Sequence, residues 1–263
     1  MIRLQAIWAL TLRHLYVWKR DVNLILMALY WPLLDIFLWG SLGLWVQQAQ
    51  ALDGTDYKLM MLLGLLLWQV IGRGCNIMVN AFIEEIWANN VINLFSLPLQ
   101  LAEWISGVAL FFTIMMSAGS LFCMIMMAKL YSISLWYLLF TFALFVTPLL
   151  FSALWIGFSA LLPIITFGKR GIEFCYVIIW FLMPFSGALY PIEVLPMWAQ
   201  RVSSALPMYY VFKGMRVYVM HQDPTGYLIK GLLLSLLYAA CAIMLFVWCF
   251  NHSKQKGLAR LTD

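Results

Sequence analysis

The feature that most constrains this chain is a series of apolar stretches, each about as long as a membrane is thick. A helix needs about 20 mostly apolar residues to cross roughly 30 Å of hydrocarbon. Hydrophobic residues make up 65% of the chain and charged residues only 10%, whereas a soluble domain is roughly 45–50% apolar. The sequence therefore predicts an all-α integral membrane protein with six spans, at about 24–46, 58–82, 104–128, 134–162, 172–190 and 228–250.

The N-terminal segment 1–23 is polar enough to stay outside the bilayer core. It mixes apolar residues with Arg3, Arg13, Lys19 and Arg20, which is typical of a basic amphipathic helix lying in the membrane interface. Nine basic residues flank the spans on the side of both termini, against six on the opposite side. Because basic residues favour the cytoplasmic face, we expect both termini in the cytoplasm and a multi-pass protein of the inner (plasma) membrane.

Composition and motifs exclude several functions. The 16 Lys and Arg residues are scattered between apolar blocks, so no basic face for nucleic acid is expected. The five cysteines lie inside apolar segments without paired spacing, and the three histidines are far apart, so no metal site is expected. The Gly168-Lys169 pair is followed by Arg170 and is not part of a phosphate-binding Walker loop. We therefore expect neither an enzyme nor a nucleotide or other cofactor in this chain.

The segment 184–227 does not fit one spanning helix. It is apolar and aromatic, yet it contains five of the nine prolines: Pro184, Pro191, Pro196, Pro207 and Pro224. Proline breaks helices, and lipid tolerates the freed backbone groups only where protein or water satisfies them. The sequence predicts a re-entrant helical hairpin on the external side, turning near Tyr190 and continuing through helices at 196–206 and 208–220.

Polar residues inside predicted spans indicate function, because burying a charge in lipid is costly. Asp35 in the first span and Arg73 in the second are the clearest cases. Their predicted depths allow an ion pair, either structural or gripping a substrate, and Arg73 could instead extend to the cytoplasmic face. Asn76 and Asn80 continue Arg73 at helical spacing, a stripe that either lines a transport path or holds helices together.

The segment 184–207, PFSGALYPIEVLPMWAQRVSSALP, resembles the membrane subunits of the ABC type-2 permease family. That family has a Pro-hydrophobic-Ser-Gly run, a Pro, a Leu-Pro-x-Trp group, a further Pro and a later Arg between its last two spans. The matching positions here are Pro184, Ser186, Gly187, Pro191, Leu195, Pro196, Trp198, Pro207 and Arg216.

The loop 84–99 is similar to the coupling helix with which these permeases contact their ATPase. The resemblance implies that Glu84 and Glu85 face basic groups of the ATPase. It also implies that apolar side chains pack against the ATPase and that a proline ends the element: Ile86, Val91, Leu94, Phe95, Leu97 and Pro98. The loop departs from the family in one respect, since Asn89-Asn90 stands where relatives usually carry a basic residue and a glycine.

The resemblance covers nearly the whole chain, residues 1–263, as a single transmembrane domain. It implies the permease half of an exporter, working with a second copy of itself and two copies of a separate ATPase that binds ATP and Mg. The cargo would be hydrophobic or amphipathic: a lipid, glycan-lipid, polysaccharide or drug. The alternative is an ion-coupled secondary transporter or an assembly scaffold without an ATPase. A carrier would be expected to show several intramembrane carboxylates, and Asp35 stands almost alone.

Overall fold

The computed structural model describes residues 3–49, 56–88 and 99–255, and these residues form helices and short connections without a strand. Five segments are long and apolar enough to cross a membrane. They are Ala28–Ala49 within α2 (Val22–Ala49), α3 (Tyr57–Trp87), α5 (Leu101–Tyr131), the folded segment Leu135–Ser186, and α11 (Thr225–Gln255). The prediction of an all-helical protein with several membrane-spanning segments is therefore confirmed at this coarser level.

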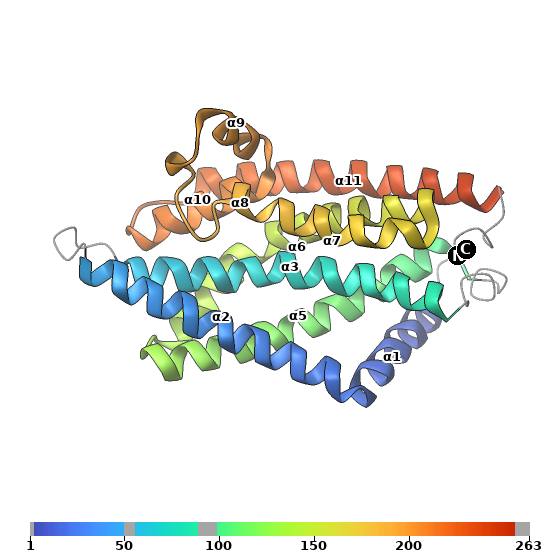
Figure 1. Ribbon diagram of the computed structural model, residues 1–263, viewed down its shortest axis with the longest axis horizontal. Helices are drawn as coiled ribbons and strands as arrows, with labels where there is room; N and C mark the ends of the chain where they lie inside the picture. The colour runs from blue at the N-terminus through green and yellow to red at the C-terminus, as the bar shows by residue number, and fades with distance from the viewer. Residues whose placement is uncertain (1–2, 50–55, 89–98, 256–263) are drawn as a thin grey trace.

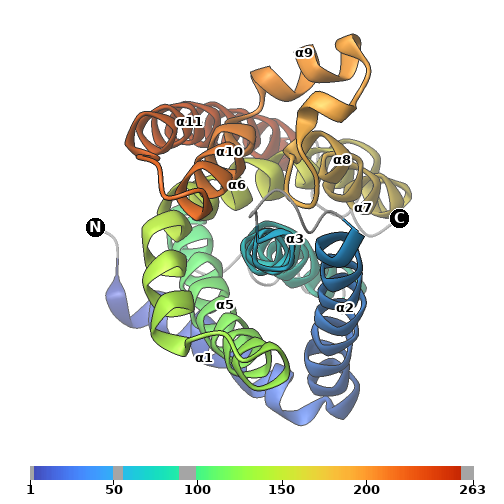
Figure 2. The ribbon, with the colours of Figure 1, turned by 90° about the vertical axis from the view of Figure 1, so that its left-hand side faces the viewer.

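Helix α3 forms the centre of the bundle. It packs against α2, α5, α6 (Leu135–Phe167) and α7 (Ile172–Phe181), and Figure 2 shows it enclosed by these neighbours. Most of its side chains between Leu62 and Ile86 are buried. Its sequence is apolar on nearly every side because it contacts protein on nearly every side.

The long helices alternate in direction along the molecule (Figure 1). The start of α1 (Leu4–Arg20) and the end of α11 lie at one end of the bundle. Helix α6 and α7 form a hairpin through the short helix η1 (Gly168–Gly171). A Cβ atom on Gly171 would lie 2.2 Å from the carbonyl oxygen of Pro163, so only glycine allows this close turn.

The predicted fifth span, 172–190, is not one long helix. Helix α7 ends at Phe181, and the four-residue α8 (Met183–Ser186) follows. The 10 residues of α7 and the 4 of α8 cover only about 21 Å at about 1.5 Å per residue, short of the hydrocarbon thickness. Helix α7 stops before Pro184, which has no N–H to continue the hydrogen-bond pattern. Gly187 then ends α8 by taking a left-handed conformation, with φ of 73°. Six full-length spans were expected, and five segments of the described chain meet the length requirement.

A compact cap lies on one side of the bundle, toward the end opposite the chain termini (Figure 1). We define the cap as residues 187–219. It contains the short helix η2 (Ile192–Val194), α9 (Met197–Ala205) and α10 (Pro207–Val219). Both longer helices fall where the sequence predicted them, at 196–206 and 208–220. Prolines at the starts of α9 and α10 set these boundaries, since a helix tolerates proline in its first turn.

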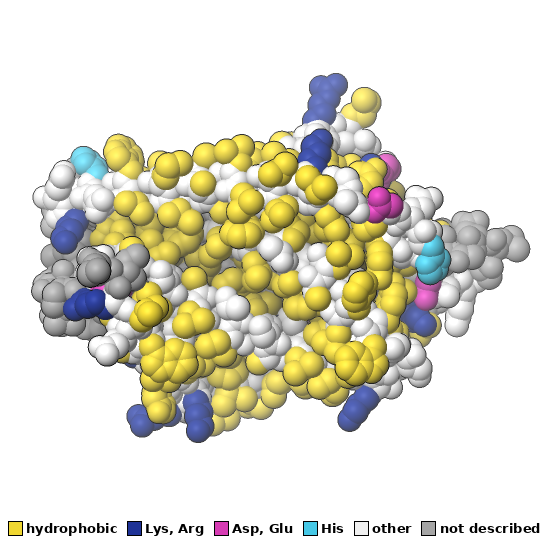
Figure 3. Space-filling view, turned by 180° about the vertical axis from the view of Figure 1, so that it is seen from behind, with side chains coloured by type: hydrophobic (Ala, Val, Ile, Leu, Met, Phe, Trp, Pro, Cys, Tyr) yellow, Lys and Arg dark blue, Asp and Glu magenta, His cyan; other side chains and the backbone are white. Residues whose placement is uncertain are grey.

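Helix α1 lies across the terminal end at an angle to the bundle (Figure 1). It buries Leu10, Thr11 and His14 and leaves Leu4 and Trp8 exposed. The prediction of a basic helix with two different faces is confirmed. Figure 3 shows the matching surface pattern, with hydrophobic side chains over the middle of the bundle and charged ones toward its ends and on the cap. This distribution fits a bilayer around the middle of the molecule.

Candidate functional site

The cap begins with a tight turn built by Ser186 and Gly187. The Ser186 hydroxyl donates to the Met183 carbonyl (2.7 Å) and accepts from the backbone N–H of Ala188 (3.1 Å). Gly187 supplies the left-handed conformation that ends α8, as glycine commonly does after a helix. The Ser-Gly pair noted in the sequence is thus a chain-reversing turn.

Arg216 of α10 holds this turn from the other side. Its guanidinium donates to the carbonyls of Gly187 and Tyr190, the latter at 2.7 Å. The Tyr190 hydroxyl in turn donates to the Pro184 carbonyl at 2.9 Å. Burial lowers the pKa of Arg216 to about 10, which leaves it charged at neutral pH. Four residues that are far apart in the sequence therefore meet in one hydrogen-bonded cluster: Pro184, Gly187, Tyr190 and Arg216.

The same turn rests directly on the central helix. A Cβ atom on Gly64 of α3 would lie 2.0 Å from the carbonyl oxygen of Ala188. No side chain larger than hydrogen fits between these two backbones without moving one of them. The cap is therefore seated on α3 at backbone contact distance.

The remaining predicted cap residues lie in its outer layer, except Pro207, which is buried. Trp198 is 63% exposed and contacts Phe185 edge to face, with ring centroids 6.0 Å apart. The carbonyl of Leu195 accepts from the Gln200 side chain at 2.8 Å. Pro191 precedes η2, Pro196 precedes α9, and Pro207 begins α10. These residues shape the cap without entering the Arg216 cluster.

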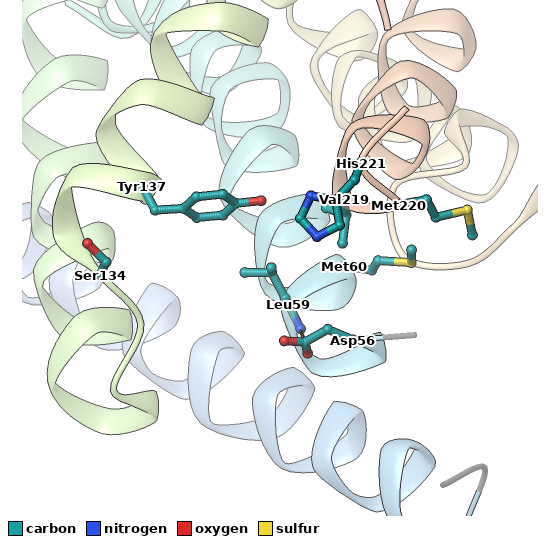
Figure 4. A pocket seen from close by; sticks show the side chains of 8 residues that line it. All are labelled: Asp56, Leu59, Met60, Ser134, Tyr137, Val219, Met220 and His221. Atoms are coloured by element: carbon teal, nitrogen blue, oxygen red, sulfur yellow. Dashed lines mark hydrogen bonds between the residues drawn. The ribbon is translucent and has the colours of Figure 1, made fainter. Parts of the chain in front are cut away.

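Beside the cap, an open hollow of about 530 Å³ lies between the first turn of α3, the start of α6 and the end of α10 (Figure 4). Sequence reasoning did not predict this hollow. Its most distinctive member, His221, has a positive φ of 60°, which no motif indicates. The lining residues are Asp56, Leu59, Met60, Ser134, Tyr137, Val219, Met220 and His221.

At the terminal end, α1 is joined by ion pairs to two helices of the bundle. Arg13 lies 2.7 Å from Glu85 in the last turns of α3. Arg3 pairs with Glu103 in the first turn of α5 at 3.1 Å, and its backbone N–H donates to the same carboxylate. We call this set of contacts the α1 junction. The junction holds α1 to the helices on both sides of the connection 88–100.

A hydrogen-bonded threonine and a buried histidine complete the α1 junction. The Thr11 hydroxyl donates to Ile7 O and Gly107 O, each at 3.0 Å. His14 stacks on Phe111, with ring centroids 5.3 Å apart. Burial lowers the pKa of His14, so the imidazole is neutral in the folded protein at neutral pH.

The predicted coupling residues divide into three groups. Glu85 and Ile86 are buried within the chain, so their placement does not match the expectation that they face an ATPase. Glu84 is 42% exposed on its side chain and lies 3.9 Å from His14. The others lie outside the described residues: Val91, Leu94, Phe95, Leu97 and Pro98.

The polar residues of the second span form a stripe whose neighbours come from three helices. Asp35 of α2 accepts from the Gln69 side chain at 3.2 Å. Arg73 lies against Gly119 of α5. Asn80 accepts from the Tyr176 hydroxyl of α7 at 2.7 Å. Among the described residues, Asp35 and Arg73 do not form an ion pair within 4 Å, so the expected pair is replaced by the Gln69 contact.

The fold and these sites define a helical, multi-pass class of membrane protein. No group of three or more metal-ligating side chains occurs in the part of the chain that the structure describes. No protein-family model matches this chain, and no relative is found among curated proteins.

Proposed function

We propose that this chain is the permease subunit of an ATP-driven exporter, with six membrane crossings and both termini in the cytoplasm. The observation that carries the proposal is the α1 junction, in which one interfacial helix is joined to the last turns of α3 and the first turn of α5. A partner that pulls on the connection between those two helices would move α1 together with them. A permease without its own ATPase needs a connection of this kind, through which movement of the partner reaches the spanning helices.

The cap gives a second line of support. In the proposed exporter, the cap covers the outer end of the path, and α7 with α8 and the cap turn completes a short sixth crossing. Irregular backbone at membrane depth is tolerated where protein satisfies it, and Arg216 satisfies two such carbonyls. The exposed Trp198 and the half-buried Tyr190 would contact cargo as it leaves.

The mechanism follows alternating access. Two ATPase chains, each with ATP and Mg, would close against the cytoplasmic ends of two copies of this permease, and lipid would surround the pair. Closure biases the permease between two arrangements. In this scheme the junction passes the motion to α2, α3 and α5, while the cap stays seated on α3. The cargo is hydrophobic or amphipathic.

The test is affinity purification of the tagged protein from its native membranes in mild detergent, with identification of the chains that co-purify and an ATPase assay. Leu94→Ala and Glu84→Arg are the test variants, because the resemblance places both residues on the coupling element. Arg201→Gln on the exposed side of the cap is the control. We expect an ATPase to co-purify with the wild type and the control and to be lost or uncoupled in the test variants. Absence of any nucleotide-binding chain would contradict the proposal and favour ion-coupled transport or scaffolding.

A further inference from the structure

The central helix α3 carries one narrow polar face. Between Leu62 and Ile86 all side chains are buried except six: Gln69, Arg73, Asn76, Ile77, Asn80 and Glu84. Five of these six are polar. At about 100° per residue, all six fall within roughly 100° of the helix circumference. The incompletely buried face of the core helix is therefore a continuous hydrophilic track through an otherwise apolar bundle.

Most polar groups on this track already have partners. Gln69 binds the Asp35 carboxylate, Asn76 donates to the Gly72 carbonyl at 2.8 Å, and Asn80 binds Tyr176. Arg73 differs from them. Among the described residues it forms neither a hydrogen bond nor an ion pair within 4 Å. The Asp35 carboxylate acts on Arg73 through space but does not contact it within 4 Å. A guanidinium at membrane depth without a contacting counter-ion is costly, so an anion on the track would have an electrostatic reason to bind there.

Space is present beside the Arg73 guanidinium. A Cβ atom on Gly119 of α5 would meet one atom within 4 Å, the Nη1 of Arg73, at 3.2 Å. The backbone of α5 thus comes close to the guanidinium without a side chain to fill the adjoining volume. Asp35 of α2, the acidic residue that acts on Arg73 through space, accepts a hydrogen bond from Gln69. The Arg73 guanidinium therefore remains available to bind an anionic ligand.

We propose that Arg73 binds the anionic headgroup of an amphiphile, with the Gly119 backbone leaving room for the headgroup and the apolar walls of α2 and α5 receiving the hydrocarbon. Guanidinium binds phosphate, carboxylate and sulfonate oxygens through two parallel hydrogen bonds. The neighbouring amides of Gln69 and Asn76 suit the rest of a polar headgroup. This inference deepens the proposed function. Identifying the bound amphiphile as transported cargo rests on the exporter proposal. Binding itself requires no ATPase.

The probe is dioleoyl-phosphatidylglycerol, with dioleoyl-phosphatidylcholine as its zwitterionic match. Native mass spectrometry of the purified full-length chain would give the affinity ratio for the two lipids. We expect Arg73→Gln to lower that ratio about tenfold, Arg73→Lys to keep most of it, and Gly119→Val to lower it with Arg73 intact. Arg170→Gln, which removes an exposed cation in η1, is the control and should leave the ratio unchanged. Size-exclusion profiles establish that each variant is folded.

A ratio that survives Arg73→Gln, or that falls equally in Arg170→Gln, would overturn the anion site. If the site is confirmed, its occupant is identified in proteoliposomes that also contain the co-purifying ATPase. ATP-dependent movement of headgroup-labelled phosphatidylglycerol, lost in Arg73→Gln, identifies cargo. Binding without movement identifies a resident anionic lipid at the same site. Failure to find an ATPase would count against the exporter proposal and leave the binding result standing.

Discussion

The two ends of the bundle are held together by different chemistry. At the cap, one guanidinium from Arg216 binds two backbone carbonyls, and the turn it holds rests on Gly64. At the α1 junction, carboxylates of Glu85 and Glu103 meet arginine side chains, and a buried His14 lies among them. The cap therefore depends on backbone geometry, and the junction depends on charge.

This difference suits the roles that we propose. Backbone carbonyls do not titrate, and a glycine contact cannot be replaced by another arrangement of side chains, so the cap has one well-defined position. Ion pairs whose arginine side chains are partly exposed contribute little to stability and are screened by salt. A junction of this kind can change between two arrangements at modest cost, as a coupling element must.

The largest effect on the difference between the two ends is expected for Gly64→Ala, which displaces the cap from α3. The added methyl group would lie 2.0 Å from the Ala188 carbonyl oxygen, so the cap turn must lift from α3. Overpacking of this kind should lower the free energy of unfolding by about 3 kcal/mol. The measurement is thermal unfolding in detergent, followed by tryptophan fluorescence. Gly226→Ala is the matched control, because nothing lies within 4 Å of its Cβ, and it should cause no loss.

The next largest effect is expected for Arg216→Ala. It leaves the carbonyls of Gly187 and Tyr190 without their donor, which should cost about 2–3 kcal/mol in unfolding free energy. Limited proteolysis of the cap should become faster. Arg216→Lys keeps the charge but not the paired donors, so it should recover only part of the loss. Full recovery by lysine would show that charge, not geometry, holds the cap.

A smaller effect at the junction is expected for Thr11→Val. The side chains have nearly the same shape, but valine cannot donate to Gly107 O, so the loss should be about 1 kcal/mol. The amide hydrogens of α1 should exchange faster in this variant than in the wild type, while those of the cap stay unchanged. Equal acceleration at both ends would contradict the view that the ends are separate units.

The smallest effect is a pH dependence confined to the junction. The pKa of His14 is lowered in the folded protein because the ring is buried, whereas it is about 6.5 in the unfolded chain. The unfolded state therefore binds the proton more tightly. The His14 contribution is complete above about pH 6.5 and is lost as pH falls through the lower, folded-state pKa. Melting temperatures between pH 5 and 8 should show this loss in the wild type, and His14→Phe should remove it.

The fold could be predicted further than the sites. The repeated apolar segments predicted the long helices, because lipid requires a certain length and composition of a spanning helix. The short α7 could not be predicted in this way, since hydropathy does not show that the helix stops at Phe181 or that Gly187 turns the chain after α8. The proline positions did place α9 and α10 correctly. In the cap, the order of Ser186, Gly187, Tyr190 and Arg216 pointed to one site, and the structure brings these residues together.

Side-chain partners were harder to predict. The sequence predicted a polar stripe on the second span, and the structure has one. The predicted membrane depths of Asp35 and Arg73 could not show that Gln69, and not Arg73, binds Asp35. Similarly, the resemblance of 84–99 to a coupling helix implied that Glu85 faces an ATPase. Its partner Arg13 comes from a helix 72 positions away in the sequence, and only the folded α1 junction reveals that pairing.

The most direct test of the account is a charge swap in the α1 junction. The protein would be reconstituted with the ATPase that the proposed function expects to co-purify, and its stimulation of ATP hydrolysis would be measured. We predict that Arg13→Glu and Glu85→Arg each abolish stimulation without releasing the ATPase, and that the double variant restores it. If both single variants stimulate like the wild type, the junction does not transmit motion and the central claim is wrong.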